Sequence, residues 1–164
     1  MINNINIRRV KANLKELFED KIDMRDFPEN QSKHFETRTL AAVALMMMAG
    51  IDVPQASIHI TDGYHDMGID AIYLDESQKK LFVILSKWRE KGTGGISQEE
   101  ISTFAQGIER ILAEDLEGAN AKIMAKQTDV DKVLTKMDYQ IHAIFIHTGD
   151  QKISSYAERP ISDL

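Results

Sequence analysis

Two neighbouring segments that are apolar on both faces constrain this fold more than any other feature of the sequence. Residues 69–74 and 81–88 are dominated by aliphatic and aromatic side chains, and the polar stretch DESQKK joins them. This composition and spacing predict a β-hairpin. Because strands that are apolar on both faces must be covered on both faces, we expect both to be central strands with helices on each side of the sheet.

The rest of the chain supplies those helices and one more strand. Apolar residues recur at helical spacing in four stretches, which are 7–18, 35–48, 101–112 and 123–137. Asn3 or Asn4 is the expected cap of the first helix, and Ser97 with Glu100 forms a capping box before the third. The β-rich run 139–147 predicts a third buried strand, with a further helix beginning after it. The expected order is α-α-β-β-α-α-β, a mixed sheet wrapped by helices.

Length and composition indicate one soluble domain. A chain of 164 residues can bury a single continuous core. Its lack of cysteine excludes disulfides and thiolate-held metal sites. The longest apolar run, 40–50, is too short to span a bilayer, and the N-terminus lacks the apolar core of a signal peptide. We therefore expect a cytoplasmic protein without a membrane partner.

Within this single domain we expect a helical segment at 1–30 and a core at 31–164. A helix that only begins near the last residue suggests the N-terminal fragment of a longer protein. The formal charge of −6 argues against nucleic-acid binding through a broad basic surface.

The hairpin carries one acidic and one basic residue among its apolar ones. If the turn pairs Leu74 with Leu81, antiparallel register places Asp70 opposite Leu85, and Lys87 lies two residues further along the same face. Burying either charge alone is costly, so the pair suggests a function. Phosphodiester cleavage needs carboxylates that hold a hard divalent cation and a positive charge beside the attacking water. Asp70 and Lys87 are of the types that this chemistry requires.

The segment TDGYHDMGIDAIYLD followed by LFVILSKW, within about residues 61–88, resembles the N-terminal nuclease-like domain of the abortive-infection phage-resistance (AIPR) family. That domain belongs to the PD-(D/E)xK restriction-endonuclease-like superfamily. The resemblance implies an α/β restriction-endonuclease-like core, a mixed central β-sheet with helices on both faces. It also implies Mg²⁺- or Mn²⁺-dependent cleavage of DNA or RNA.

The resemblance also implies roles for individual residues. Asp70 matches the motif aspartate, Lys87 the motif lysine, and Glu36 in HFETRTLAA the helix glutamate, so these three are the expected catalytic residues. The expected metal ligands are Asp70, Glu36 and the main-chain carbonyl of Ser86, with Asp66 as a further carboxylate. The expected partners are DNA or RNA and the remainder of a larger parent protein, and a homodimer is an open alternative to a monomer.

One departure from the family pattern leaves a second hypothesis open. Leu85 stands where the family has Glu, Asp or Gln, which removes a side-chain oxygen from the site. The chain is therefore either an active nuclease or a degenerate nuclease fold that serves as a nucleic-acid-binding or assembly module. A third hypothesis, a helix-turn-helix built from LAAVALMMMAGIDVPQAS, lacks an arginine or lysine in its second segment to contact phosphate.

Overall fold

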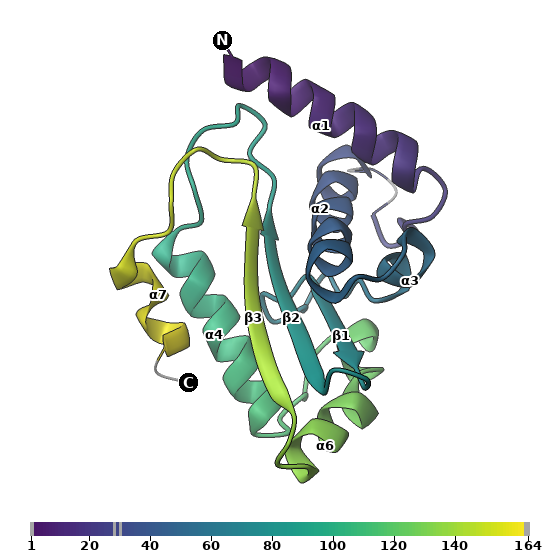
Figure 1. Ribbon diagram of the computed structural model, residues 1–164, viewed down its shortest axis with the longest axis vertical. Helices are drawn as coiled ribbons and strands as arrows, with labels where there is room; N and C mark the ends of the chain where they lie inside the picture. Colours follow the sequence, from purple (N-terminus) through teal and green to yellow (C-terminus); the bar gives the residue numbers. More distant parts are fainter. Residues whose placement is uncertain (1, 28, 30, 163–164) are drawn as a thin grey trace.

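Helices cover both faces of a small sheet in this protein (Figure 1). The computed structural model describes residues 2–27, 29 and 31–162. Its elements in chain order are α1 (Ile2–Phe18), α2 (Gln31–Ala49), α3 (Val53–Ile58), β1 (Ala71–Asp75), β2 (Lys80–Lys87), α4 (Gln98–Leu112), α5 (Ala121–Met124), α6 (Gln127–Thr135), β3 (Gln140–His147) and α7 (Ser155–Ser162).

The sheet is mixed, as the sequence predicts, with the strand order β1-β2-β3. The β1 and β2 strands are antiparallel, and Leu74 pairs with Leu81 as expected for the hairpin. The β2 and β3 strands are parallel, from Lys80 opposite Gln140 to Lys87 opposite His147. The central strand is therefore β2, and both of its neighbours bring their residues into register with it.

Two expectations about the strands are wrong. β1 is an edge strand and not a central one, and an isolated bridge between Ile60 and Ala71 lies on its outer side. β3, expected to be buried, is half-exposed along its length, and Gln140 is exposed. An apolar composition favours a strand but does not determine its place in the sheet, and β3 lies at the second edge, where it has one strand neighbour.

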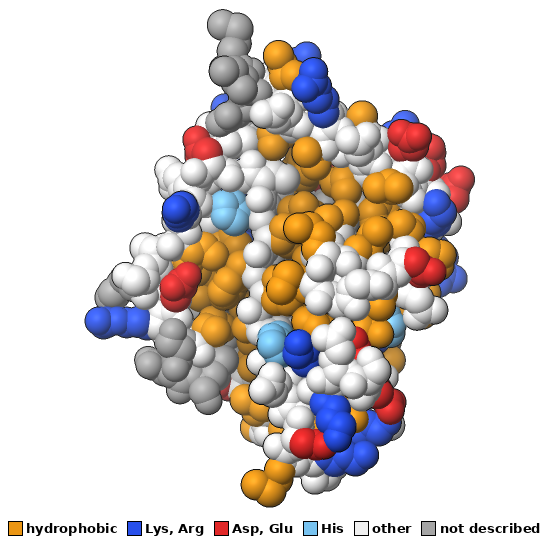
Figure 2. Space-filling view, in the orientation of Figure 1, with side chains coloured by type: hydrophobic (Ala, Val, Ile, Leu, Met, Phe, Trp, Pro, Cys, Tyr) orange, Lys and Arg blue, Asp and Glu red, His pale blue; other side chains and the backbone are white. Residues whose placement is uncertain are grey.

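Alternate residues of β2 face two separate hydrophobic cores, so the expected helices on both sides of the sheet are confirmed. Leu81, Val83 and Leu85 pack with residues of α4, α6 and α7. Phe82 and Ile84 pack with residues of α1, α2 and α3. Hydrophobic side chains also gather at the surface over α2 and β3 on the face shown in Figure 2.

The helix boundaries follow local signals in most places. Ser97 and Glu100 form the expected capping box of α4. The helix expected over 123–137 is divided into α5 and α6, and α1 begins at Ile2, so Asn3 and Asn4 lie inside it and do not cap it. None of the described helices is both long and apolar enough to cross a membrane.

Candidate metal centre

Three aspartates gather at the beginning of β1 and in the loop before it. Asp62, Asp66 and Asp70 each offer a carboxylate oxygen, and among the described residues these oxygens lie within 4.8 Å of one another. Asp62 and Asp70 are buried and Asp66 is half-buried. Asp66 and Asp70 are among the ligands expected from the sequence, and Asp62 is a carboxylate that was not expected.

Asp70 is held by the central strand. Its Oδ2 accepts hydrogen bonds from the backbone N–H of Ser86 at 2.6 Å and from the Ser86 hydroxyl at 3.2 Å. Its backbone N–H donates to the carbonyl of Ile84 at 2.8 Å. Burial, and then the negative charge of Asp62, raise the pKa of Asp70 well above its ordinary value. A cation bound beside this carboxylate would therefore stabilise its ionised form.

Asp66 accepts two hydrogen bonds from the backbone of the loop in which it lies. Its Oδ1 accepts from the N–H of Gly68 at 2.8 Å, and its Oδ2 accepts from the N–H of Gly63 at 3.2 Å. Burial raises the pKa of Asp66 above its ordinary value. The loop lies so close to α4 that a methyl group at Gly107 would come within 2.2 Å of the Met67 carbonyl oxygen. The loop and α4 therefore fix the position of Asp66 together.

Asp62 is held by a buried arginine. The side chain of Arg38 is completely buried, and its Nε donates to Asp62 Oδ2 at 2.7 Å. Its two terminal nitrogens donate to the two carboxylate oxygens of Asp26, each at 2.7 Å. These bonds from Arg38 lower the pKa of Asp26 to about 2. The guanidinium thus compensates two acids, and it orients Asp62 toward the site.

Arg38 was likewise not among the residues expected from the sequence, although its spacing from apolar residues indicates that it is buried. Arg38 precedes Ala41, Ala42 and Leu45 at helical spacing, and these three residues are buried against the sheet. A cation on the apolar face of a helix requires buried acidic partners. The position of Arg38 in the sequence therefore predicts buried acidic partners for it.

Lys87 is the last residue of β2 and directly follows Ser86, whose N–H binds Asp70. Its side chain is 30% exposed, and its Nζ is 4.0 Å from an oxygen of Glu100 on α4. The positive charge of Lys87 lowers the pKa of both Asp66 and Asp70, against the stronger effect of burial. Asp66 and Asp70 thus lie in one carboxylate group with Asp62. Lys87 lies near Glu100, and its catalytic role stays a prediction.

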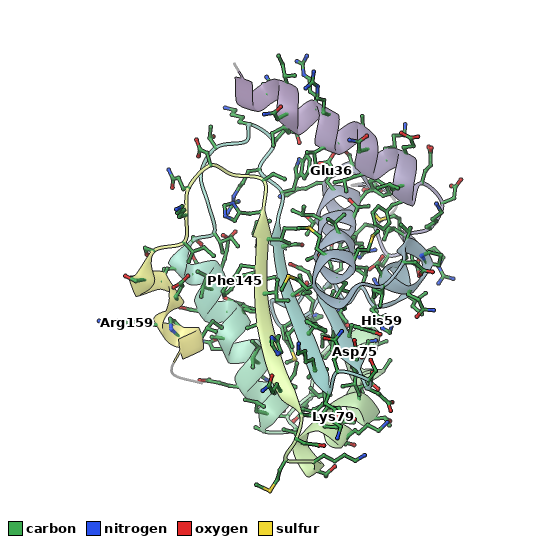
Figure 3. The ribbon with its side chains drawn as sticks, viewed as in Figure 1. Glu36, His59, Asp75, Lys79, Phe145 and Arg159 are labelled. Carbon is green, nitrogen blue, oxygen red and sulfur yellow. The ribbon has the colours of Figure 1, made fainter. Side chains whose placement is uncertain are left out.

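The structure places Glu36 elsewhere. Glu36 forms an ion pair with Lys11 and accepts a hydrogen bond from the Ser32 hydroxyl at 3.0 Å. It lies at the end of α2 near α1 (Figure 3), where it lines a cavity of about 470 Å³ with Trp88 and other residues. Among the described residues it is not part of the carboxylate group. The expectation that Glu36 joins Asp70 is not met, because its position on α2 directs it to Lys11.

Ser86 and Leu85 are neighbours on β2, and only Ser86 contacts Asp70 with its side chain. Ser86 contacts Asp70 through its N–H and its hydroxyl, and a metal contact by its carbonyl stays a prediction. Leu85 is buried in the core that includes α4 residues, so this position offers no side-chain oxygen. Asp62 and Asp66 provide carboxylates in its place.

The donor set suits a hard divalent cation. Three carboxylates that converge within 4.8 Å offer the oxygen ligands that Mg²⁺ and Mn²⁺ prefer. Such an ion would supply Lewis-acid polarisation of a phosphoryl oxygen and would make a nearby water more acidic. Lys87 adds a positive charge at the same place.

Comparison with known proteins identifies no relative. No protein-family model matches the chain, and neither a curated protein nor a solved structure matches it. The case for a function therefore depends on the geometry of these residues and on the resemblance in the sequence of the hairpin.

Proposed function

We propose that this chain is a Mg²⁺- or Mn²⁺-dependent nuclease-type domain that hydrolyses phosphodiester bonds of DNA or RNA. The observation that carries this proposal is the convergence of three aspartates at one end of the hairpin, where Ser86 binds Asp70 and the next residue, Lys87, ends the central strand. The resemblance of the hairpin to the AIPR family adds the PD-(D/E)xK class and a role in anti-phage defence.

Each residue has a definite task in this proposal. Asp62, Asp66 and Asp70 would hold the cation through their carboxylate oxygens. Lys87 would orient the attacking water and offset the negative charge that develops on the phosphoryl oxygens. Arg38 would hold Asp62 in place without contacting the substrate, since it is completely buried. A bond from the water oxygen to phosphorus forms as the bond to the leaving oxygen breaks.

Replacing Lys87 by alanine should remove most of the cleavage and leave metal binding. If Lys87 stabilises the transition state, loss of its ammonium should lower the rate by about 10²-fold or more. The measurement is cleavage of plasmid and of single-stranded DNA and RNA with Mg²⁺ or Mn²⁺. The matched control is Lys80→Ala, which removes the lysine at the opposite end of the same strand and should leave the rate unchanged.

Two outcomes would count against the proposal. One is equal cleavage by wild type and Lys87→Ala. The other is a wild-type protein that neither cuts under any condition nor binds Mn²⁺ in isothermal titration calorimetry.

A degenerate nuclease fold is the second candidate function, and the burial of Leu85 favours it. The side chain of Leu85 is 1% exposed and offers no oxygen to a metal or water. If the site is degenerate, the wild type should be silent and Leu85→Gln should gain cleavage. If the first proposal holds, Leu85→Gln should only lower stability, by roughly 1–3 kcal/mol for an amide buried in an apolar core. Urea unfolding and the cleavage assay separate the two results.

A further inference from the structure

An exposed tyrosine lies in the loop that carries two of the three aspartates. Tyr64 stands between Asp62 and Asp66, and it is 73% exposed. Its ring nevertheless contacts Phe27, with 5.0 Å between the ring centroids and 47° between the planes. An aromatic side chain that is supported on one side and open to solvent on the other can accept a flat partner.

Tyr64 is the exposed member of an aromatic cluster, here called the column, that it forms with Phe27 and His34. Phe27 lies parallel to His34, with centroids 3.5 Å apart and an interplanar angle of 1°. The guanidinium of Arg38 lies over the Phe27 ring at 5.0 Å. His34 Nδ1 is 3.8 Å from Asp62 Oδ2, so the column borders the aspartate group directly.

The backbone around Tyr64 is held firmly. Asp66 accepts from the N–H groups on both sides of the tyrosine segment, those of Gly63 and Gly68. The carbonyl of His65 accepts from the N–H of Asn120 at 3.0 Å. His65 also has a positive φ of 58°, a conformation that surrounding structure must maintain. A ring on such a loop loses little conformational entropy when a ligand stacks on it.

We propose that Tyr64 is the stacking platform for an unpaired nucleobase, next to the phosphate that a cation at the aspartates would hold. The site would therefore take single-stranded nucleic acid. The inference rests on the proposed function and specifies its substrate class. Stacking tolerates any base, because every base has a π-face. It also suits a chain with a net charge of −6, which has little basic surface for duplex phosphates. A paired base is already stacked within its duplex and leaves no face for the tyrosine.

The test measures binding of 12-nucleotide oligo(dT) and oligo(rU), each labelled with fluorescein, by fluorescence anisotropy in Ca²⁺. Tyr64→Ala should weaken binding of the preferred oligonucleotide by about 5- to 150-fold, the effect of losing one base stack. Tyr64→Phe keeps the ring and should stay within about 2-fold of wild type. Met137→Ala removes a fully exposed apolar side chain and should have no effect. The tighter of the two oligonucleotides identifies DNA or RNA as the source of the base.

Four results would overturn the inference. The first is wild-type protein that binds neither oligonucleotide, and the second is Tyr64→Ala that binds as well as wild type. The third is Tyr64→Phe that loses as much affinity as Tyr64→Ala. The fourth is a pre-annealed duplex that is bound as tightly as the single strand. Circular dichroism verifies that each variant is folded. Failure of the proposed function looks different, because cleavage and Mn²⁺ binding would then be absent while Tyr64-dependent binding of the oligonucleotide persists.

Discussion

Arg38→Met should unfold far more easily than wild type, with a loss of about 3–5 kcal/mol in the free energy of unfolding. The substitution keeps an apolar side chain of similar length but removes the cation that compensates Asp62 and Asp26. Asp62 would then be a buried carboxylate without its cationic partner. For a chain of this length the loss corresponds to a fall of about 6–20 °C in Tm. Thermal and urea unfolding, followed by circular dichroism, measure it.

The control for this prediction is the nearby Arg25, whose side chain is 90% exposed and paired with Asp23. Arg25→Met should leave the unfolding midpoint unchanged, because exposed ion pairs contribute little. Asp62→Asn should cost less stability in the Arg38→Met background than in wild type, since the two residues share one interaction. If Arg38→Met and Arg25→Met have the same unfolding midpoint, the role assigned to Arg38 is wrong.

Asp70→Asn should abolish metal binding and cleavage, and yet stabilise the metal-free protein at neutral pH. Burial raises the pKa of Asp70, so its contribution to stability is complete below the unfolded value near 3.8 and is lost as the pH rises through the folded pKa. At neutral pH the buried carboxyl group therefore destabilises the fold relative to the unfolded chain, in which it ionises freely. An amide oxygen can still accept from Ser86, so we expect a gain of roughly 0.5–2 kcal/mol.

The pH and metal dependence make this prediction specific. The difference between Asp70→Asn and wild type should shrink as the pH falls through the raised pKa of folded Asp70 toward the unfolded value near 3.8, where the unfolded chain also binds the proton. Mn²⁺ at about 100 times its Kd should stabilise the wild type by ~2.7 kcal/mol and leave Asp70→Asn unchanged. Unfolding curves at several pH values, with and without Mn²⁺, provide the measurement.

Asp75 is the matched control, because it ends the strand that begins directly after Asp70 and its pKa is shifted in the opposite direction. Hydrogen bonds from Ser77 and Gln78 lower the pKa of Asp75. Its contribution to stability is therefore present at neutral pH and lost as the pH falls through its folded pKa. Asp75→Asn should be less stable than wild type at pH 7 and should still bind Mn²⁺. A metal-free Asp70→Asn protein that is also less stable than wild type would show that the assigned direction is wrong.

The parts of the fold that depend on local patterns could be predicted. The register of Leu74 with Leu81 follows from the length of the turn between two apolar segments. The capping box of Ser97 and Glu100 lies within four residues of the chain. The place of β3 at the edge of the sheet could not be predicted, because its composition is equally suitable for a buried strand. The break between α5 and α6 was missed in the same way, as the apolar spacing continues across it.

Residue spacing alone predicts the hairpin, its register and the positions of Asp70 before β1 and Lys87 at the end of β2. Alternation of side chains along a strand is a property of the local backbone, so these positions follow from residue spacing. Which other groups reach Asp70 depends on how distant segments pack together. Asp62 is brought there by Arg38, which lies 24 residues earlier, whereas Glu36, two residues before Arg38, faces Lys11. That choice depends on how α2 packs against the sheet and against α1, and a periodic pattern within α2 does not contain this information.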